Sequence, residues 1–399
     1  MNLIRRQTVS DKVRVGIIGC GAFARCEHMP NCVKNPRIEV AVACSRSEKN
    51  RQIARELCQP ERTTPNAADV FEADDVDMVI LAVPHDQHET MIAGAAAAGK
   101  HILCEKPMSM SMAESYRIVR AVKEGGVKLC VDYNRRYSPS VLEMKKMYLE
   151  HRAHPKVNPG RFVEVPDRAP FPEEETTMML IRINDESSTY RLVHLDWHTG
   201  GGQIIGECCH WLDLACYMME RKPVRVFATG SARLNHIINV DFDNGSRFCL
   251  FFSVNGTFEY PKELIEITDH GALFINECFV ENRTYGAVGE THKTYNMQFD
   301  GCPEAGREGG MTGYLSKLRR RAEVMSQSMG KEWRDLFPNK GHYELLDAFV
   351  DSILNDTPSP ISEIDGAKAT YLSLRAIESI RHGVPMPVNE EEFAFHVEA

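Results

Sequence analysis

One short stretch near the N-terminus constrains the fold of this chain more than any other. Residues 13–18 form an apolar run that predicts a buried strand, and the motif Gly19-x-Gly21-x-x-Ala24 follows it, where an amphipathic helix can begin. Gly19 permits a tight turn, Gly21 lets the main chain approach a ligand, and Ala24 keeps helix and strand close. This order predicts a site for the pyrophosphate of a dinucleotide at the N-terminus of the helix.

A second predicted strand, residues 38–44, ends where a ribose-binding residue is expected. NAD enzymes usually place Asp or Glu there, whereas this chain has Ser45 followed by Arg46. A guanidinium binds phosphate through two parallel hydrogen bonds, so this pair favours NADP with its 2′-phosphate. If Ser45 only caps the next helix and Arg46 is solvated, NAD remains open.

Composition excludes several classes of protein. A length of 399 residues is enough for two domains, and the net charge of −9 comes without a long basic block, which argues against nucleic-acid binding. We find no apolar run long enough to span a membrane and no apolar segment of signal-peptide type at the N-terminus. The 13 cysteines therefore predict reduced thiols in a cytoplasmic protein. Since no cysteine or histidine spacing matches a zinc site, we expect no metal.

The first third of the chain alternates strands and helices. Apolar runs at 77–83, 101–104 and 127–131 predict strands, with helices between them at 88–98 and 113–123. This alternation predicts an α/β Rossmann domain with a doubly wound parallel sheet over residues 1–136. In such sheets ligands bind beyond the carboxyl ends of the strands, so the loops at these ends matter most.

From residue 137 the pattern changes to longer alternating segments. Residues 137–399 predict an α+β domain with a large, mostly antiparallel, open-faced sheet, whose strands include 177–183, 224–230, 237–241, 248–254 and 264–267. Two amphipathic helices at 342–354 and 364–381 are expected to pack back near the first domain. Residues 166–175 and 281–313 are rich in Gly, Pro and acidic residues and predict long loops or insertions.

Two further motifs point to a family. The first, Glu105-Lys106-Pro107, stands at the carboxyl end of a predicted strand. The second runs from the glycine turn at 200–202 through Glu207-Cys-Cys-His210 to Asp213 on a predicted helix. With the N-terminal glycine turn, these motifs resemble the Gfo/Idh/MocA family, named for glucose–fructose oxidoreductase and inositol dehydrogenase. The resemblance covers nearly the whole chain apart from the two predicted insertions.

The resemblance implies an NAD(P)-dependent oxidoreductase acting on a secondary hydroxyl of a sugar, glycoside or cyclitol, in a homo-oligomer such as a dimer or tetramer. Lys106 matches the family's active-site lysine, and an ammonium there polarises a reacting oxygen. His210 matches the catalytic histidine, a general base for the hydroxyl proton. Asp213 either orients that imidazole or packs the helix.

One position departs from the family pattern. Many members carry Asp four residues before the histidine, and this chain has Gly206 there. The neighbouring Glu207 either takes over the acidic role or makes a structural bond.

The remaining candidate residues surround the expected cofactor and substrate. Flat aromatic faces suit the stacking of a sugar ring, and Arg and His donate to hydroxyls. The candidates for cofactor binding are Gly19, Gly21, Ala22, Phe23, Ala24, Ser45, Arg46, Pro84, His85, His88, Glu105, Lys106 and Asn134. The candidates for substrate binding are Lys106, Arg135, Tyr137, Trp197, His198 and His210. For Arg135, Tyr137, Trp197 and His198, ordinary packing or a place on the surface is the alternative.

Two other functions use the same fold. Some members of the family hold NAD tightly and oxidise a ring hydroxyl only transiently, so that a glycosidic bond is eliminated and the hydride returns. A related function is oxidation of a 3-hydroxyl as the first step of glycoside cleavage. A third hypothesis is a non-catalytic NAD(P)-binding regulator. The presence of Lys106 and His210 argues against it, because a regulator needs neither residue.

Overall fold

The computed structural model describes residues 12–153, 177–186, 195–257, 260–287, 289, 291–295, 311–315 and 338–392. These residues fall into two compact units. The first unit holds residues 12–132 and 342–370, and the second holds the described residues of 133–341 together with 371–392. No helix in these ranges is long and apolar enough to cross a membrane.

The first unit is a parallel sheet with the strand order β3-β2-β1-β4-β5-β6. Its strands are β1 (Val13–Ile18), β2 (Ile38–Cys44), β3 (Arg62–Thr64), β4 (Met78–Leu81), β5 (His101–Cys104) and β6 (Leu129–Val131). The helical segments are η1 (Ala24–His28), α1 (Met29–Lys34), α2 (Glu48–Cys58), α3 (Ala68–Phe71), η2 (His85–Gln87), α4 (His88–Ala97), α5 (Met112–Gly125) and α10 (His342–Leu354). The predicted doubly wound parallel sheet is confirmed.

Local sequence explains why these elements form where they do. All four residues of β4 are buried, as expected for a central parallel strand covered on both faces. Helix α5 begins at Ser111, whose hydroxyl accepts a hydrogen bond from the Glu114 N–H, and ends at Gly126 in the left-handed conformation. The Ser111 cap thereby ends the loop that follows β5 at the carboxyl edge of the sheet, where a ligand is expected.

The second unit is built on a nine-stranded sheet with the order β14-β13-β12-β11-β7-β10-β9-β8-β15. Its strands are β7 (Met178–Asn184), β8 (Pro223–Gly230), β9 (His236–Phe242), β10 (Arg247–Ser253), β11 (Glu263–Asp269), β12 (Ala272–Glu277), β13 (Glu281–Tyr285), β14 (His292–Thr294) and β15 (Met386–Pro387). All neighbouring pairs are antiparallel except β7 with β10, so the predicted mostly antiparallel sheet is confirmed.

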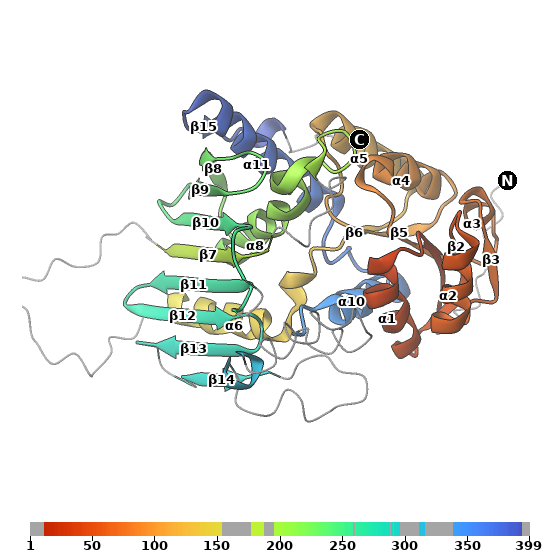
Figure 1. Ribbon diagram of the computed structural model, residues 1–399, viewed down its shortest axis with the longest axis horizontal. Helices are drawn as coiled ribbons and strands as arrows, with labels where there is room; N and C mark the ends of the chain where they lie inside the picture. The colour runs from red at the N-terminus through yellow and green to blue at the C-terminus, as the bar shows by residue number, and fades with distance from the viewer. Residues whose placement is uncertain are drawn as a thin grey trace, which may run out of the picture. The chain divides into compact units, whose positions relative to one another are not determined.

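Helices cover one face of this sheet. The helical segments of the unit include η3 (Asn134–Tyr137), α6 (Pro139–Ala153), η5 (Ile204–Cys208), α8 (Cys209–Met219), η7 (Glu390–Glu392) and the C-terminal part of α11 (Glu363–His382). Helix α6 packs on β11, β12 and β13 (Figure 1). The Ser379 hydroxyl of α11 accepts from the main-chain N–H of Ala228 on β8 at 2.9 Å. Buried and exposed residues alternate along β10, as expected when one face is open.

The segment 281–313, predicted to be a long loop or insertion, begins instead with strands β13 and β14 at one end of the sheet. This prediction was wrong because β13 is polar and lacks the apolar alternation that marks a strand. Its buried polar side chains find partners on other elements, since the Asn282 amide donates to the Ser140 carbonyl of α6 at 2.7 Å. The other predicted insertion, 166–175, lies outside the described residues.

Candidate functional site

The glycine turn after β1 has the geometry that a dinucleotide requires. Gly19 has a φ of +99°, and a Cβ placed there would lie 2.2 Å from the Ala82 carbonyl oxygen. Only glycine fits, because both the backbone conformation and the space exclude a side chain. A Cβ on Gly21, in contrast, would meet nothing within 4 Å, so open space lies over this residue.

The helix that follows the turn supplies free donors. Helical hydrogen bonding starts with the Arg25 N–H donating to the Gly21 carbonyl at 3.2 Å, so the N–H groups of Ala22, Phe23 and Ala24 precede the first bonded turn. Phe23 is exposed and Ala24 is buried against the sheet. The open space over Gly21 and these N–H groups fit the pyrophosphate of a nicotinamide nucleotide.

The loop after β2 presents the residues predicted to read the ribose. The cap of α2 is Ser47, whose hydroxyl accepts from the Asn50 N–H, so Ser45 does not serve as the helix cap. Arg46 is exposed. The sequence analysis missed Arg51, one turn into α2, whose guanidinium donates to the Ser45 carbonyl at 2.6 Å and thereby fixes the loop.

The loops after β4 and β5 hold Pro84, His85, Glu105 and Lys106, all at least partly accessible. His88 is different, because it is fully buried and its ring nitrogens face the carbonyls of Pro107 at 2.7 Å and Val83 at 3.1 Å. This corrects the expectation of a direct cofactor contact for His88. The ring instead links the two loops, and it thereby helps to hold the segment that carries Glu105 and Lys106.

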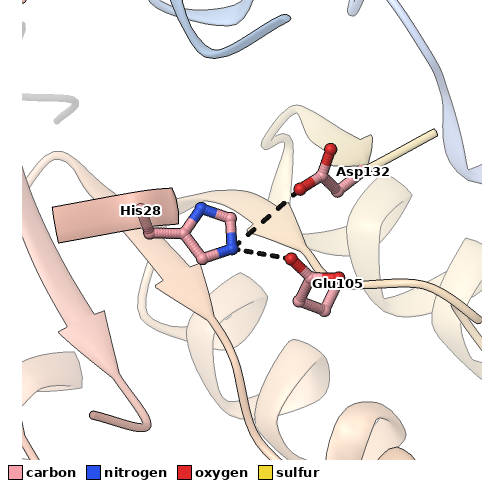
Figure 2. A group of neighbouring side chains, drawn as sticks. All are labelled: His28, Glu105 and Asp132. Carbon is pink, nitrogen blue, oxygen red and sulfur yellow. Dashed lines mark hydrogen bonds and ion pairs between the residues drawn. The ribbon is translucent and has the colours of Figure 1, made fainter. Parts of the chain in front are cut away.

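Four titratable side chains that the sequence analysis did not group together meet at the carboxyl edge of this sheet. Nε2 of His28, on η1, lies 2.7 Å from Oε1 of Glu105 and 3.9 Å from Oδ2 of Asp132, which follows β6 (Figure 2). Nδ1 of His342, the first residue of α10, lies 3.3 Å from the same Oδ2. We call His28, Glu105, Asp132 and His342 the acid–imidazole cluster. Asp132 could have been predicted from its place directly after β6, because the carboxyl ends of parallel strands lie at the same edge of a sheet.

The electrostatics of the acid–imidazole cluster differ from those of exposed groups. Burial and the charge of Asp132 raise the pKa of Glu105, despite its bond to His28. Burial opposes protonation of His28 and His342, but the carboxylates beside them outweigh it and raise both imidazole pKa values. Burial raises the pKa of Asp132, but the charge of His342 outweighs burial and lowers this pKa to about 2.

The short distance between Nε2 of His28 and Oε1 of Glu105 fits a shared proton better than two ligands of one metal ion. Two ligands of a tetrahedral zinc ion lie roughly 3.3 Å apart, as bond lengths near 2.0–2.1 Å require. His28 and Glu105 are at 2.7 Å, which is a hydrogen-bond distance.

The second unit holds the predicted catalytic histidine. His210 lies on α8 and is buried, and its ring contacts Tyr133 edge-to-face with centroids 5.8 Å apart. Glu207, partly accessible, lies on the π-helical turn η5 that leads into α8. π-Helical turns are frequent at functional sites, and η1, which carries His28, is also one. Lys106 lies in the first unit and His210 in the second.

Asp213 has an arginine as its partner. Both carboxylate oxygens accept from the Arg136 guanidinium, with Nε at 2.7 Å from Oδ2 and the second bond between Nη2 and Oδ1. Both side chains are buried. Of the two roles that the sequence left open for Asp213, this geometry supports packing of the helix.

Two predicted ligand-binding residues are engaged inside the second unit. The Arg135 guanidinium pairs with Glu263 at 3.0 Å and lies over the Trp211 ring at 4.5 Å, while Lys340 pairs with the same carboxylate at 2.7 Å. Asn134 is fully buried, and its amide donates to the Lys340 carbonyl at 2.9 Å. These contacts correct the direct substrate and cofactor roles expected for Arg135 and Asn134, because neither side chain is exposed to a ligand.

The other predicted substrate-binding residues are accessible. Tyr137 and Trp197 are partly exposed and His198 is exposed. The Trp197 ring lies beside Gly202, where a Cβ would approach it to 3.3 Å. The Asp196 carboxylate accepts from the N–H groups of His198 and Thr199 at 3.0 Å each, which forms the turn between Trp197 and the glycine stretch.

Comparison with known proteins finds dehydrogenases among the proteins that this chain resembles. Residues 13–133 match the model of an oxidoreductase family with an NAD-binding Rossmann fold, the Gfo/Idh/MocA family. The chain is 25% identical to inositol 2-dehydrogenase 3 of Saccharopolyspora erythraea over 381 residues, 94% of this chain and 95% of that one. It is 24% identical to myo-inositol 2-dehydrogenase of Thermotoga maritima over 273 residues, 66% of this chain and 75% of the relative.

Solved structures share the fold. A crystal structure of an oxidoreductase from Agrobacterium radiobacter, in complex with NAD+, L-tartaric acid and magnesium, superposes with a TM-score of 0.72 at 17% identity. The superposition covers 94% of this chain and 98% of that one.

Proposed function

Because this chain belongs to the Gfo/Idh/MocA family of NAD(P)-dependent oxidoreductases that act on CH–OH groups, we propose that it oxidises a secondary hydroxyl of a sugar, glycoside or cyclitol, or reduces the matching ketone. The observation that carries the proposal is the glycine turn, with open space over Gly21, on the same sheet edge as Glu105 and Lys106. The substrate class is supported by the inositol dehydrogenases among the relatives.

When bound, a nicotinamide nucleotide supplies the hydride acceptor or donor. The N–H groups of Ala22, Phe23 and Ala24 hold its pyrophosphate, and Glu105 contacts the nicotinamide ribose. The ammonium of Lys106 then polarises the reacting oxygen of the substrate, which makes its proton easier to remove. His210 accepts that proton during oxidation and returns it during reduction.

Partly accessible side chains of the second unit bind the substrate in this proposal. Tyr137 and Trp197 offer ring faces to the apolar side of a sugar, and His198 donates to a hydroxyl. Glu207 lies one helical turn before His210. Its negative charge raises the pKa values of Arg135 and Lys262. We assign it an electrostatic role beside the general base.

The cofactor proposal is NADP, argued from Ser45 and Arg46. Ser47 is the helix cap, so the Ser45 hydroxyl and the exposed Arg46 guanidinium remain candidates for a 2′-phosphate. Arg46→Ala should weaken NADP binding about tenfold or more and leave NAD binding within about twofold, because only NADP carries the phosphate.

The open face of the nine-stranded sheet supports the proposed homo-oligomer. Met178, Ile237 and Phe251 are exposed on neighbouring strands, and Phe251 and Ile237 are directly paired in register. Apolar side chains gathered on one face favour association with a second copy. Light scattering after size exclusion would give the mass of the particle, and a monomer at micromolar concentration would contradict this part of the proposal.

The central experiment begins with denaturing the purified protein and identifying any nucleotide released. A panel of sugars, glycosides and cyclitols is then added with NAD or NADP while absorbance at 340 nm is followed. Steady production of reduced nucleotide from one class supports the dehydrogenase. Stoichiometric bound NAD with product formed, but no lasting change at 340 nm, would replace it by the redox-neutral glycosidase.

Variants then test the assigned roles. Lys106→Met should lower kcat about 10²–10⁴-fold while nucleotide binding persists, since the ammonium acts on the substrate. Lys123→Met, an exposed position on α5, is the matched control and should keep full activity. An active Lys106→Met enzyme would refute the role of this lysine.

A further inference from the structure

Of the acid–imidazole cluster, the proposed reaction uses only Glu105, and it leaves His28, Asp132 and His342 without a role. It holds two carboxyl groups and two imidazoles, and the side chains of Glu105 and His342 are each 11% exposed. Asp132 is nearly fully buried, and its Oδ1 atom has no hydrogen-bond partner among the described residues. Such a group is costly to keep inside a protein, which suggests that the arrangement serves a ligand.

The charge of the acid–imidazole cluster depends on how many protons it holds. The close contact between His28 and Glu105 is neutral when the two share one proton, whichever group carries it. The same is true of Asp132 with His342. With two protons the cluster is therefore neutral, and each proton lost adds one buried negative charge.

The position of the cluster relates it to one half of a nicotinamide nucleotide. Glu105 and Asp132 follow β5 and β6, on one side of the glycine turn, whereas Ser45 and Arg46 follow β2 on the other side. In this fold the β1–β3 half receives the adenosine part and the β4–β6 half receives the other nucleotide. The cluster thus stands at the half that receives nicotinamide.

The oxidised and reduced nucleotides differ in one electrostatic respect. The oxidised nicotinamide ring carries a positive charge, and the reduced ring is neutral. A buried negative charge at this half of the crevice stabilises the oxidised form and leaves the reduced form almost unaffected.

We propose that the acid–imidazole cluster sets the preference of this protein for oxidised over reduced nicotinamide nucleotide, and that His28 and His342 make this preference rise with pH as they lose protons. This inference rests on the proposed function. His28 is a positioning residue here, because it acts through the orientation and charge of Glu105.

The carboxylates beside the two imidazoles raise their pKa values, whereas the imidazole of His342 lowers that of His28. Glu27 on η1 acts on His342, and Cys104 at the end of β5 feels both carboxylates. On the side of η1, Phe23 contacts both imidazole rings edge-on with centroids 5.6 and 5.5 Å away, and it brings no charge. Both imidazole pKa values are raised above the ordinary 6.5, so the two rings lose their protons at a higher pH than exposed histidines do.

The test measures binding of the nucleotides to the intact protein, without substrate. Dissociation constants for the oxidised and reduced forms of the preferred nucleotide are determined by calorimetry between about pH 6 and pH 9. The quantity of interest is the ratio of the two affinities. His28→Gln keeps an N–H group near Glu105 but removes a titrating cation, and Asp132→Asn removes a negative charge at nearly constant shape. His101→Gln, at the opposite end of β5, is the matched control.

The two variants should shift the ratio in opposite directions. Near pH 6, His28→Gln should raise the preference for the oxidised form about tenfold and flatten its pH dependence, while Asp132→Asn should lower it about tenfold. The control should follow the wild type. If the cluster had a merely structural role, both variants would bind the oxidised and the reduced nucleotide equally more weakly. An unchanged ratio of the two affinities would therefore overturn the inference.

The wild-type protein separates failure of the inference from failure of the proposed function. If it binds neither nucleotide, the oxidoreductase proposal fails along with this one. If it binds both with a ratio independent of pH, the function stands and the cluster has no such role.

Discussion

Replacing Asp213 by Asn gives a direct measure of what holds α8 in place. The Asp213 side chain is 2% exposed and that of Arg136 is 10% exposed, and the two share a bidentate pair. The amide keeps the shape of the carboxylate but removes its charge and points an N–H group at the guanidinium. The buried Arg136 then loses the negative charge of its bidentate partner.

The expected cost follows from this burial. Breaking a buried ion pair by removing one partner destabilises a protein by about 3–5 kcal/mol, mostly because the remaining charge is uncompensated. For a unit of this size each kcal/mol corresponds to about 2–4 °C, so the transition of the second unit should fall by roughly 6–20 °C. The double variant Arg136→Met with Asp213→Leu should recover most of the loss, because it buries no charge.

Calorimetry and urea denaturation followed by circular dichroism measure these changes. The control is Glu390→Gln, which removes an exposed pair with Lys222 in the same unit and should leave the melting temperature unchanged. A loss below about 1 kcal/mol for Asp213→Asn, or a double variant no more stable than the single one, would refute the argument. A normal melting temperature with a large loss of kcat would instead return Asp213 to the catalytic role that the sequence left open.

Two further predictions concern the glycine turn and acid stability. Gly19→Ala should destabilise the first unit by about 2–4 kcal/mol, because its Cβ would clash with the Ala82 carbonyl. Gly21→Ala should keep normal stability but bind nucleotide at least about tenfold more weakly. Equal melting temperatures for the two variants would contradict this prediction. Glu263 is buried, but the charges of Arg135 and Lys340 outweigh burial and lower its pKa to about 2. Because this folded pKa lies below the unfolded value near 4.3, the carboxylate stabilises the fold at neutral pH, and roughly 3 kcal/mol of that stability should disappear as the pH falls from about 5 to 2. Urea denaturation at several pH values would measure this loss, and an unchanged acid slope in Glu263→Gln would show that other groups cause it.

Local patterns were sufficient to predict the classes of both sheets. The strand, glycine turn and helix at residues 13–28 are contiguous in sequence, so their physical requirements are visible without the fold. The helix predicted at 342–354 has those bounds in the structure, because its apolar spacing is regular. Strand β13 was missed since its buried residues are polar, and their partners lie on other elements.

Only the tertiary structure could bring together groups that are far apart in the chain. His28 and Glu105 are 77 residues apart, and His342 follows Asp132 by 210 residues, yet the parallel strands and α10 place all four at one sheet edge. Likewise, Arg136 and Asp213 are 77 residues apart, and their pairing supports a packing role for this candidate catalytic carboxylate. The sequence by itself determined which local elements form, because propensity and periodicity act over a few residues. The charge state and partners of the buried side chains were decided by the fold, because burial and Coulomb interactions act between residues that only folding makes neighbours.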